Sequence, residues 1–529
     1  MKPKMREAST ITERSITIRS LGRLLQHRQL SLLACLIAGA LTPLSLSPFN
    51  LWLIGLLSLA LFAIILSRCP SAKTSLLAAY IFAIGYYGTG VSWVFVSIYY
   101  FGSTSFILAI IMTILFILFV ALFFALPFYA MHWFKPSLRL LLGFPLLWVF
   151  SEWLRTWILT GFPWLYIGYS HLETPLSGWA PIGGVLLIGL WSSLSSSTLA
   201  LWLMRSYSLP IRIAIIGLVA TLWLGGYILQ SIPWTEPAGD NVSVGLVQPN
   251  IPQDQRWKPS YRNTIKQRLR ELSGPLWSND WIIWPEAAIP HLYHNSLDFI
   301  DETRALAKQH NTIVVTGVLY NDWPLNKQQP DYYNSIIGIG DAEGIYHKQR
   351  LVPFGEYVPL EHFVRGLIDF FNLPLSVISS GQSEQNNLRL GQHILANAIC
   401  YEIAYPNLVA NQAKGSSVLL TVSNDAWFGH SIGPIQHFQI ARMRALEIGR
   451  YIIRGTNNGI SAIIEPDGQI QAQTEQFVAT RLEGTITPMQ GTTPYMRWRD
   501  YPLLVLFVLL AAAGFRKDIG IGKITFHSE

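Results

Sequence analysis

The sequence predicts a multi-pass α-helical membrane bundle of about eight spanning helices, joined to an extracytoplasmic α/β domain. Of the 529 residues, 51% are hydrophobic and 13% are charged, whereas soluble domains carry roughly 25% charged residues. The apolar residues are concentrated in 30–232 and 499–515, and 237–496 has the composition of a soluble protein. This distribution excludes a wholly soluble, a disordered and a fibrous protein, and it predicts two structural parts.

Spanning helices are expected wherever about 20 mainly apolar residues follow one another, because the hydrocarbon core of a bilayer is roughly 30 Å thick. Seven such segments precede residue 233 and an eighth lies near the C-terminus: 30–46, 51–67, 75–100, 104–132, 137–157, 180–204, 210–230 and 499–515. The first two and the last are short, so tilting or local thinning of the bilayer is expected there.

The charges between these segments predict their orientation. The N-terminal tail, 1–29, is basic, and so are the second, fourth and sixth connections, while the first and third carry no charge. Because basic loops stay in the cytoplasm, we expect both tails, 1–29 and 516–529, to be cytoplasmic and the domain 237–496 to be extracytoplasmic. The same charge pattern is typical of a protein that contacts membrane lipid, and no nucleic-acid partner is expected.

Two charged residues lie inside the fifth predicted helix. Glu152 and Arg155 are three residues apart near its outer end, and charges within a membrane are costly unless they are paired. We therefore expect a mutual ion pair, with a role in binding a substrate headgroup as the alternative.

The domain 237–496 is predicted to be a layered α/β fold, because short β-branched and apolar runs alternate with helical patterns. Strands are predicted at 242–247, 281–284, 312–318, 335–339, 394–399, 418–422, 451–454 and 460–464, and helices at 258–273, 297–310 and 434–448. Hairpin turns are predicted at 341–344 and 465–468.

Reactive side chains follow several of these predicted strands. Glu286 comes just after 281–284, which places its carboxylate at the rim of the sheet, where partial desolvation favours use as a general base; a simple loop acid is the alternative. Lys348 follows the first hairpin turn, and on its own it is equally consistent with a solvated lysine. The sequence contains no paired His or Cys spacing of the kind that holds a metal.

Cys400 directly follows the predicted strand 394–399, the position of a nucleophile on a sharp turn after a strand. The alternative is a small buried apolar residue. Of the three cysteines, Cys35 and Cys69 fall in or at predicted spanning helices. Cys400 therefore has no disulfide partner in an oxidising compartment, which favours a reactive thiol.

Together these three residues resemble the Glu–Lys–Cys triad of the nitrilase (carbon–nitrogen hydrolase) superfamily. They occur in order as Trp-Pro-Glu286, His-Lys348-x-x-Leu-Val-Pro-Phe-Gly-Glu and Cys400-Tyr-Glu, with spacings of 62 and 52 residues. With seven predicted helices before the domain and one after it, the chain from about 30 to 515 is similar to the bacterial apolipoprotein N-acyltransferase family. Further matching motifs are Gly161-Phe-Pro-Trp164, Ser423-Asn-Asp-Ala-Trp-Phe-Gly429, Gln436-His437, Ala441-Arg-Met-Arg-Ala-Leu-Glu447 and Thr456-Asn-Asn-Gly459.

The resemblance implies an αββα sandwich and the last step of lipoprotein maturation, in the bacterial cytoplasmic (inner) membrane with the catalytic domain on the periplasmic face. A phospholipid, with phosphatidylethanolamine as the expected donor, would give its sn-1 acyl chain to the enzyme as a thioester. The acceptor would be the α-amine of the diacylglyceryl-modified N-terminal cysteine of an apolipoprotein. No cofactor and no metal are expected.

The same resemblance implies roles for individual residues. Cys400 would be the nucleophile and Glu286 the proton acceptor, while Lys348 would stabilise the thiolate and, with the backbone N–H of Tyr401, the oxyanion. Glu356 is expected to orient Lys348 or to help move protons. Glu402 is expected to shape the pocket.

Two other classes of protein remain as alternatives. A membrane-tethered nitrilase-like amidase would use water or ammonia instead of lipid transfer. A transporter or receptor is disfavoured, because the predicted helices carry few ionisable residues and show no duplicated halves.

A further hypothesis concerns the segment 357–374. Apolar residues recur there at steps of three and four, which is typical of an amphipathic helix. We interpret it as a mobile lid on the outer leaflet that opens for the lipid donor and then for the acceptor. A helix packed on its own domain is the alternative.

Overall fold

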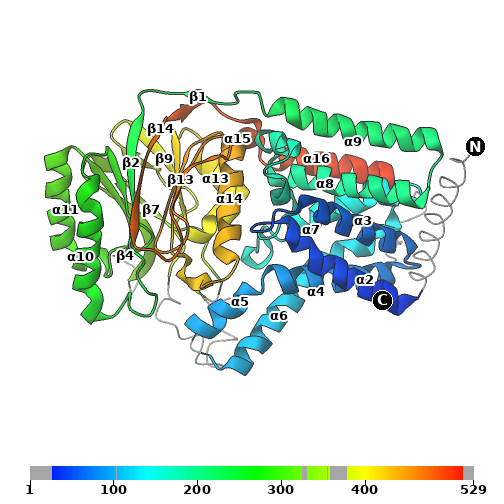
Figure 1. Cartoon of the computed structure of the whole chain (residues 1–529), viewed down its shortest axis with the longest axis horizontal. Helices are drawn as coiled ribbons and strands as arrows, with labels where there is room; N and C mark the ends of the chain where they lie inside the picture. Colours follow the sequence, from blue (N-terminus) through cyan, green and yellow to red (C-terminus); the bar gives the residue numbers. More distant parts are fainter. Residues whose placement is uncertain (1–26, 103, 324–329, 354, 358–377, 516–529) are drawn as a thin grey trace, which may run out of the picture.

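Helical and α/β parts lie side by side, with the helices at one end of the molecule and the strands at the other (Figure 1). This computed structural model describes residues 27–102, 104–323, 330–353, 355–357 and 378–515. Most of the predicted lid, most of the basic N-terminal tail and the whole C-terminal tail therefore lie outside the described residues.

Each of the eight predicted apolar segments contains a helix. These helices are α2 (Arg28–Leu41), α3 (Trp52–Arg68), α4 (Ala72–Gly90), α6 (Phe106–Ala125), α7 (Phe144–Leu154), α8 (Ala180–Met204), α9 (Leu209–Leu229) and α16 (Tyr501–Gly514). Within the described residues, four helical stretches are long and apolar enough to cross a membrane, namely Arg28–Ser45, Phe106–Trp133, Pro175–Met204 and Leu209–Leu229. Helices α3 and α16 are shorter apolar helices.

The third predicted segment is not a straight helix. Helix α4 ends at Gly90, and the following Trp93–Phe101 stretch, which begins with α5 (Trp93–Val96), is bent from it by 53°. A Cβ atom on Gly90 would lie 2.3 Å from Cδ1 of Leu165, so a larger residue would force the Leu165 side chain to move. Beyond the bend, Ser97 Oγ donates a 2.8 Å hydrogen bond to the carbonyl of Trp427 in the α/β part.

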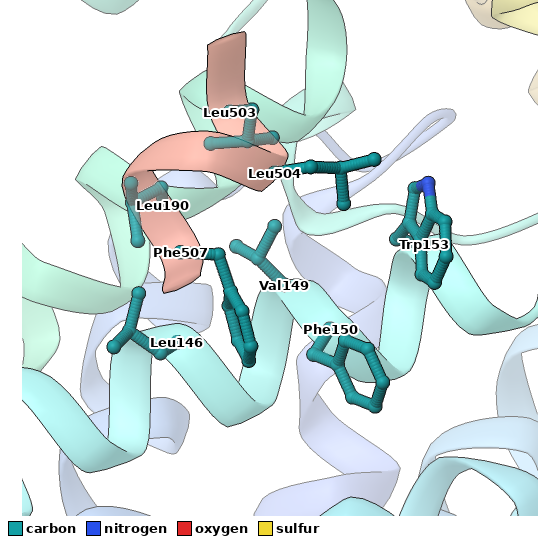
Figure 2. Close-up of a pocket in the computed structure, with 8 residues that line it drawn as sticks. All are labelled: Leu146, Val149, Phe150, Trp153, Leu190, Leu503, Leu504 and Phe507. Carbon is teal, nitrogen blue, oxygen red and sulfur yellow. The ribbon is translucent and has the colours of Figure 1, made fainter. Parts of the chain in front are cut away.

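Helix α16 brings the chain back against the bundle. Its side chains close an entirely apolar pocket against α7 and α8, and Figure 2 shows these side chains turned toward one another. The lining residues are Leu146, Val149, Phe150, Trp153, Leu190, Leu503, Leu504 and Phe507. The C-terminal helix thus belongs to the same helical body as the helices that precede the α/β domain.

The α/β part is a sandwich of two sheets with helices on both outer faces, which confirms the layered fold predicted from the sequence. One sheet has the order β14-β2-β3-β4-β5-β7, and the other β13-β12-β11-β10-β9-β8-β6. The first sheet comprises β2 (Val242–Gln248), β3 (Trp281–Ile283), β4 (Ile313–Asp322), β5 (Asp331–Ile339), β7 (Ile345–His347) and β14 (Thr480–Ile486). The second comprises β6 (Ala342–Glu343), β8 (Leu388–Leu390), β9 (His393–Ile399), β10 (Val418–Ser423), β11 (Ile452–Thr456), β12 (Ala462–Ile464) and β13 (Ile470–Gln473).

Helices α10 (Arg262–Ser273) and α11 (Leu297–His310) cover the outer face of the first sheet, and α13 (Pro406–Gln412) and α14 (Gly433–Ile448) cover the second (Figure 1). Helix α14 also contacts α8, so the bundle, α13, α14 and the second sheet share one continuous apolar core. The two connections to the bundle pair as antiparallel strands β1 (Glu236–Pro237) and β15 (Met489–Gln490). The α/β domain is therefore held to the bundle both by its connections and by its packed face.

Candidate active site

Parallel strands from the two sheets bring their carboxyl ends to one region of the domain. Strands β2, β3 and β4 are parallel in one sheet, and β9, β10 and β11 are parallel in the other. Glu286 follows β3, Cys400 follows β9 and Asn424 follows β10. This topology explains why residues far apart in the sequence meet at one site.

Cys400 lies on a strained turn. It has a φ of +52°, a left-handed conformation that costs a residue other than glycine about 1–2 kcal/mol. Strand β9 ends at Ile399, and a 3₁₀ turn, Cys400–Ala404, begins with the cysteine itself. Cys400 is half-buried as a residue and forms no disulfide. This arrangement matches the nucleophile position predicted from the sequence.

Lys348 is fully buried between two carboxylates. Its Nζ lies 2.8 Å from Oε2 and 2.9 Å from Oε1 of Glu356, and 3.8 Å from Oε1 of Glu286. Glu356 is itself fixed, because its Oε2 accepts a 2.9 Å hydrogen bond from the backbone N–H of Val352. Glu356 therefore lies in direct contact with the Lys348 ammonium, and its role in orienting Lys348 or moving protons stays a prediction.

Glu286 is held by one hydrogen bond to each carboxylate oxygen. Asn334 Nδ2 donates to Oε1 at 2.7 Å, and the backbone N–H of Asn424 donates to Oε2 at 2.7 Å. The buried guanidinium of Arg256 donates to the carbonyls of Glu286 and Ala287. These contacts fix both the side chain and the backbone of Glu286 beside Lys348.

The charges of the site act on the Cys400 thiol in opposite directions. Burial and then the charge of Glu286 raise the pKa of Cys400 to about 12, and the ammonium of Lys348 works to lower it. For Lys348, burial lowers the pKa, but the charges of Glu356, Glu286 and Cys400 raise it by more. The pKa of Lys348 therefore lies above its usual value. At neutral pH the cysteine is a thiol and the lysine is charged, so the thiol needs a base when it reacts.

Glu402 joins the segments that carry Lys348 and Cys400. Its Oε1 accepts hydrogen bonds from the backbone N–H groups of Gln349 at 2.6 Å and Arg350 at 3.1 Å. Its Oε2 accepts one from the N–H of Ile399 at 2.7 Å. Burial raises the pKa of Glu402 to about 7. The side chain thus connects the backbone of the two segments, and its role in shaping the pocket stays a prediction.

Comparison with known proteins covers almost the whole chain. Residues 38–198 match the family model "Apolipoprotein N-acyltransferase N-terminal domain", and 244–492 match "Carbon-nitrogen hydrolase". The apolipoprotein N-acyltransferase of Pseudomonas syringae pv. tomato is 41% identical, over 90% of this chain and 95% of its own length. Those of Azotobacter vinelandii and Vibrio cholerae are 42% and 39% identical, over 90% and 94% of this chain and 93% and 98% of their own lengths.

The chain belongs to the apolipoprotein N-acyltransferase family. This finding confirms the resemblance stated from the sequence, and it does not favour an amidase, because the match includes the helical bundle as well as the hydrolase-like domain.

In this family member, one loop of the bundle lies directly against the Cys400 turn. Tyr401 donates a 3.1 Å hydrogen bond to the carbonyl of Gly161, and Tyr405 donates one of 2.8 Å to that of Thr160. Trp164 of the same loop donates from Nε1 to Gln436 on α14 at 2.8 Å. The Gly161–Trp164 motif noted in the sequence is therefore part of the wall behind the candidate nucleophile.

The predicted ion pair between Glu152 and Arg155 is wrong: no ion pair between them is found in the described part of the chain. Arg155 caps α7 after its last residue, Leu154, and the two side chains turn to different partners. Its guanidinium donates to the carbonyl of Trp164 at 3.1 Å, and Glu152 accepts from the backbone N–H of Ile167 at 2.8 Å. Both residues hold the loop that backs the Cys400 turn.

Sequence reasoning missed the residues that fix Glu286. Asn424 lies in the Ser-Asn-Asp motif noted above, so the sequence did contain a local signal for it. Asn334, on β5, and Arg256, in a loop, belong to no such motif. Among the residues that the structure describes, no group of three or more His, Cys, Asp or Glu side chains is placed to hold a metal ion.

Proposed function

We propose that this protein N-acylates the N-terminal diacylglyceryl-cysteine of apolipoproteins, with a phospholipid such as phosphatidylethanolamine as the acyl donor. The observation that carries the proposal is the meeting of Cys400, Glu286 and Lys348 at the strand ends of a chain that belongs to this family. The curated relatives bear the name apolipoprotein N-acyltransferase.

In the first half reaction Glu286 takes the proton of the Cys400 thiol, and the thiolate attacks the carbonyl carbon of the lipid ester. The ammonium of Lys348 and the backbone N–H of Tyr401 stabilise the negative oxygen of the tetrahedral intermediate. Its collapse breaks the ester C–O bond, and the departing lysophospholipid oxygen receives the proton from Glu286. The product is a thioester on Cys400.

In the second half reaction the α-amine of the acceptor attacks the thioester carbonyl. Glu286 removes the proton that the amine loses, the C–S bond breaks, and the thiolate of Cys400 recovers that proton. The amide remains on the lipoprotein and the enzyme returns to its starting state. The lysophospholipid leaves before the amine attacks the thioester, so the sequence of steps is ping-pong.

The intact mass of the purified protein after exposure to phospholipid tests this function. A fatty-acyl increment that maps to Cys400 and disappears when a diacylglyceryl-peptide amine is added is the expected result. Release of free fatty acid or ammonia without transfer to the amine would indicate hydrolysis or amidase activity instead.

We further propose that the helices form eight spans of the inner membrane, with the catalytic domain 237–496 on the periplasmic face and both tails, 1–29 and 516–529, in the cytoplasm. The remaining parts are then the seven-helix bundle 30–232 and the C-terminal helix 499–515. The basic second, fourth and sixth connections support this orientation.

Cysteine labelling of sealed cells tests the orientation. A cysteine at Asp298, which is exposed on α11, should react with a membrane-impermeant maleimide from outside. A cysteine at Lys73, which is exposed in the first turn of α4, should react only after the cells are permeabilised. Labelling of position 73 from outside would reverse the topology and contradict periplasmic access to lipoproteins.

Glu356→Gln is expected to slow acylation of Cys400 by about 10- to 100-fold, because it removes the charged partner of a buried ammonium. Two contacts to Lys348, at 2.8 and 2.9 Å, depend on this carboxylate. The measurement is the single-turnover rate of thioester formation. Glu343→Gln, an exposed glutamate of the same domain, is the matched control, and an unchanged rate in Glu356→Gln would contradict an orienting role.

A further inference from the structure

The carbonyl of Cys400 has a partner that the mechanism above does not use. His437, on α14, lies with Nε2 3.1 Å from the carbonyl oxygen of Cys400. The imidazole is fully buried. His437 thus contacts the strained residue Cys400 directly, and its helix, α14, also packs on α8 of the bundle.

Two charged residues face the other side of the imidazole. Nδ1 of His437 is 3.1 Å from Nη2 of Arg454 and 3.1 Å from Oδ1 of Asp425. The same Nη2 donates to Oδ2 of Asp425 at 2.8 Å, and Ser423 Oγ donates to Oδ1 at 2.6 Å. All of these side chains are buried, so the imidazole is held in a fixed polar environment.

The surrounding groups determine which nitrogen of His437 carries the proton. A carbonyl oxygen only accepts, so Nε2 must carry a hydrogen to bond Cys400. Nδ1 faces both a donor, Nη2 of Arg454, and an acceptor, Oδ1 of Asp425. Burial and then Arg454 lower the pKa of His437, which favours the neutral ring at pH 7. His437 thus donates from Nε2 to the carbonyl of Cys400, while Arg454 and Asp425 hold the Nδ1 side of the ring.

The ring faces of His437 are also covered. Trp164 of the bundle loop stacks on the imidazole with centroids 5.7 Å apart and planes at 29°. Phe428 lies 5.9 Å away. The imidazole can therefore neither rotate nor move away from Cys400 without displacing packed aromatic rings.

We propose that His437 is a positioning residue of the acyl transfer: its Nε2–H bond to the Cys400 carbonyl keeps the turn in the left-handed conformation that presents the thiol to Glu286 and Lys348. This inference rests on the proposed role of Cys400 as the nucleophile. His437 touches neither substrate nor the reacting atoms; it acts by opposing the conformational cost of a positive φ at a residue that carries a side chain. The contact also orients the following peptide unit, which contains the N–H of Tyr401.

Two variants separate the hydrogen bond from the packing. His437→Gln places a side-chain N–H near the position of Nε2 but loses the aromatic stack, whereas His437→Phe keeps an aromatic ring against Trp164 but has no donor. We expect His437→Phe to lower kcat by about tenfold or more, the effect of one lost hydrogen bond, with KM for phospholipid unchanged. His437→Gln should keep kcat close to the wild-type value.

Each rate is measured as acylation of Cys400 by phospholipid vesicles, alongside alkylation of Cys400 by iodoacetamide and the melting temperature. His171→Phe is the matched control, because His171 is a buried histidine of the bundle whose nitrogens contact Thr174 and Ser192. It should leave kcat per folded molecule unchanged.

Wild-type rates in His437→Phe, or equal slowing of both His437 variants, would overturn the inference, because packing alone would then explain the residue. If His437→Phe does not fold, a folded but slow His437→Gln variant overturns it, and a fast one supports it. Failure of the wild-type protein to form a thioester would instead overturn the proposed function.

Discussion

We expect Cys400→Ser to form no stable acyl-enzyme and to transfer acyl chains at least about 10³-fold more slowly than the wild type. A serine hydroxyl is far less acidic than a thiol, and its oxyester is a poorer acyl donor to an amine than a thioester. Expression and membrane insertion should be normal, because the turn and its backbone contacts are retained. Transfer of labelled acyl chains to a diacylglyceryl-peptide is the measurement.

The other two cysteines provide internal controls for this result. Cys35 is buried in α2 and Cys69 lies at the end of α3, both away from the α/β domain. Cys35→Ser and Cys69→Ser should therefore retain transfer per folded molecule. Turnover in Cys400→Ala would disprove the assignment of the nucleophile.

Glu286→Gln and Lys348→Met should each lower the rate of acylation by at least about 10²-fold, since one removes the base and the other the charge beside the oxyanion. Their effects on the free thiol should be opposite. The charge of Glu286 raises the pKa of Cys400 and that of Lys348 lowers it. At neutral pH, iodoacetamide should therefore alkylate Cys400 faster in Glu286→Gln and more slowly in Lys348→Met.

A matched control for these variants is Lys308→Met, which removes an exposed lysine from α11 and should change neither rate. Equal alkylation in wild type and Lys348→Met would show that the ammonium does not act on the thiol. Wild-type transfer by Glu286→Gln would require another base.

Residues at strand ends could be placed from the sequence, because the end of a buried strand is visible as a local pattern. Glu286 and Cys400 follow such runs, and the structure finds both at the ends of parallel strands. Lys348 has no such signal beyond the family resemblance. Asn334 could not have been found, because its contact with Glu286 depends on the order of strands in the sheet, and no local pattern records that order.

The spanning segments show the same limit. Hydropathy located each helix, but it did not reveal the 53° bend after Gly90 or the short regular part of α7, Phe144–Leu154. Both lie at tertiary contacts that hydropathy does not record: Gly90 packs closely against Leu165, and Arg155 donates to the carbonyl of Trp164. The edge strand β14 was also missed, because its exposed and partly buried residues alternate and only its last residue is buried.

The bundle loop that contacts Tyr401 and Tyr405 fixes the distance of the nucleophile from the membrane. Because the carbonyls of Thr160 and Gly161 are bonded to the segment that carries the nucleophile, the thiol is fixed relative to the ends of the helices. In the proposed orientation, Cys400 then stands at a constant height above the bilayer. Donor and acceptor diffuse to the enzyme in the plane of the bilayer, and each must present its reactive atoms at that height. The enzyme would thus select substrates by how deep their reactive group lies in the lipid layer. A domain on a flexible tether could not select in this way.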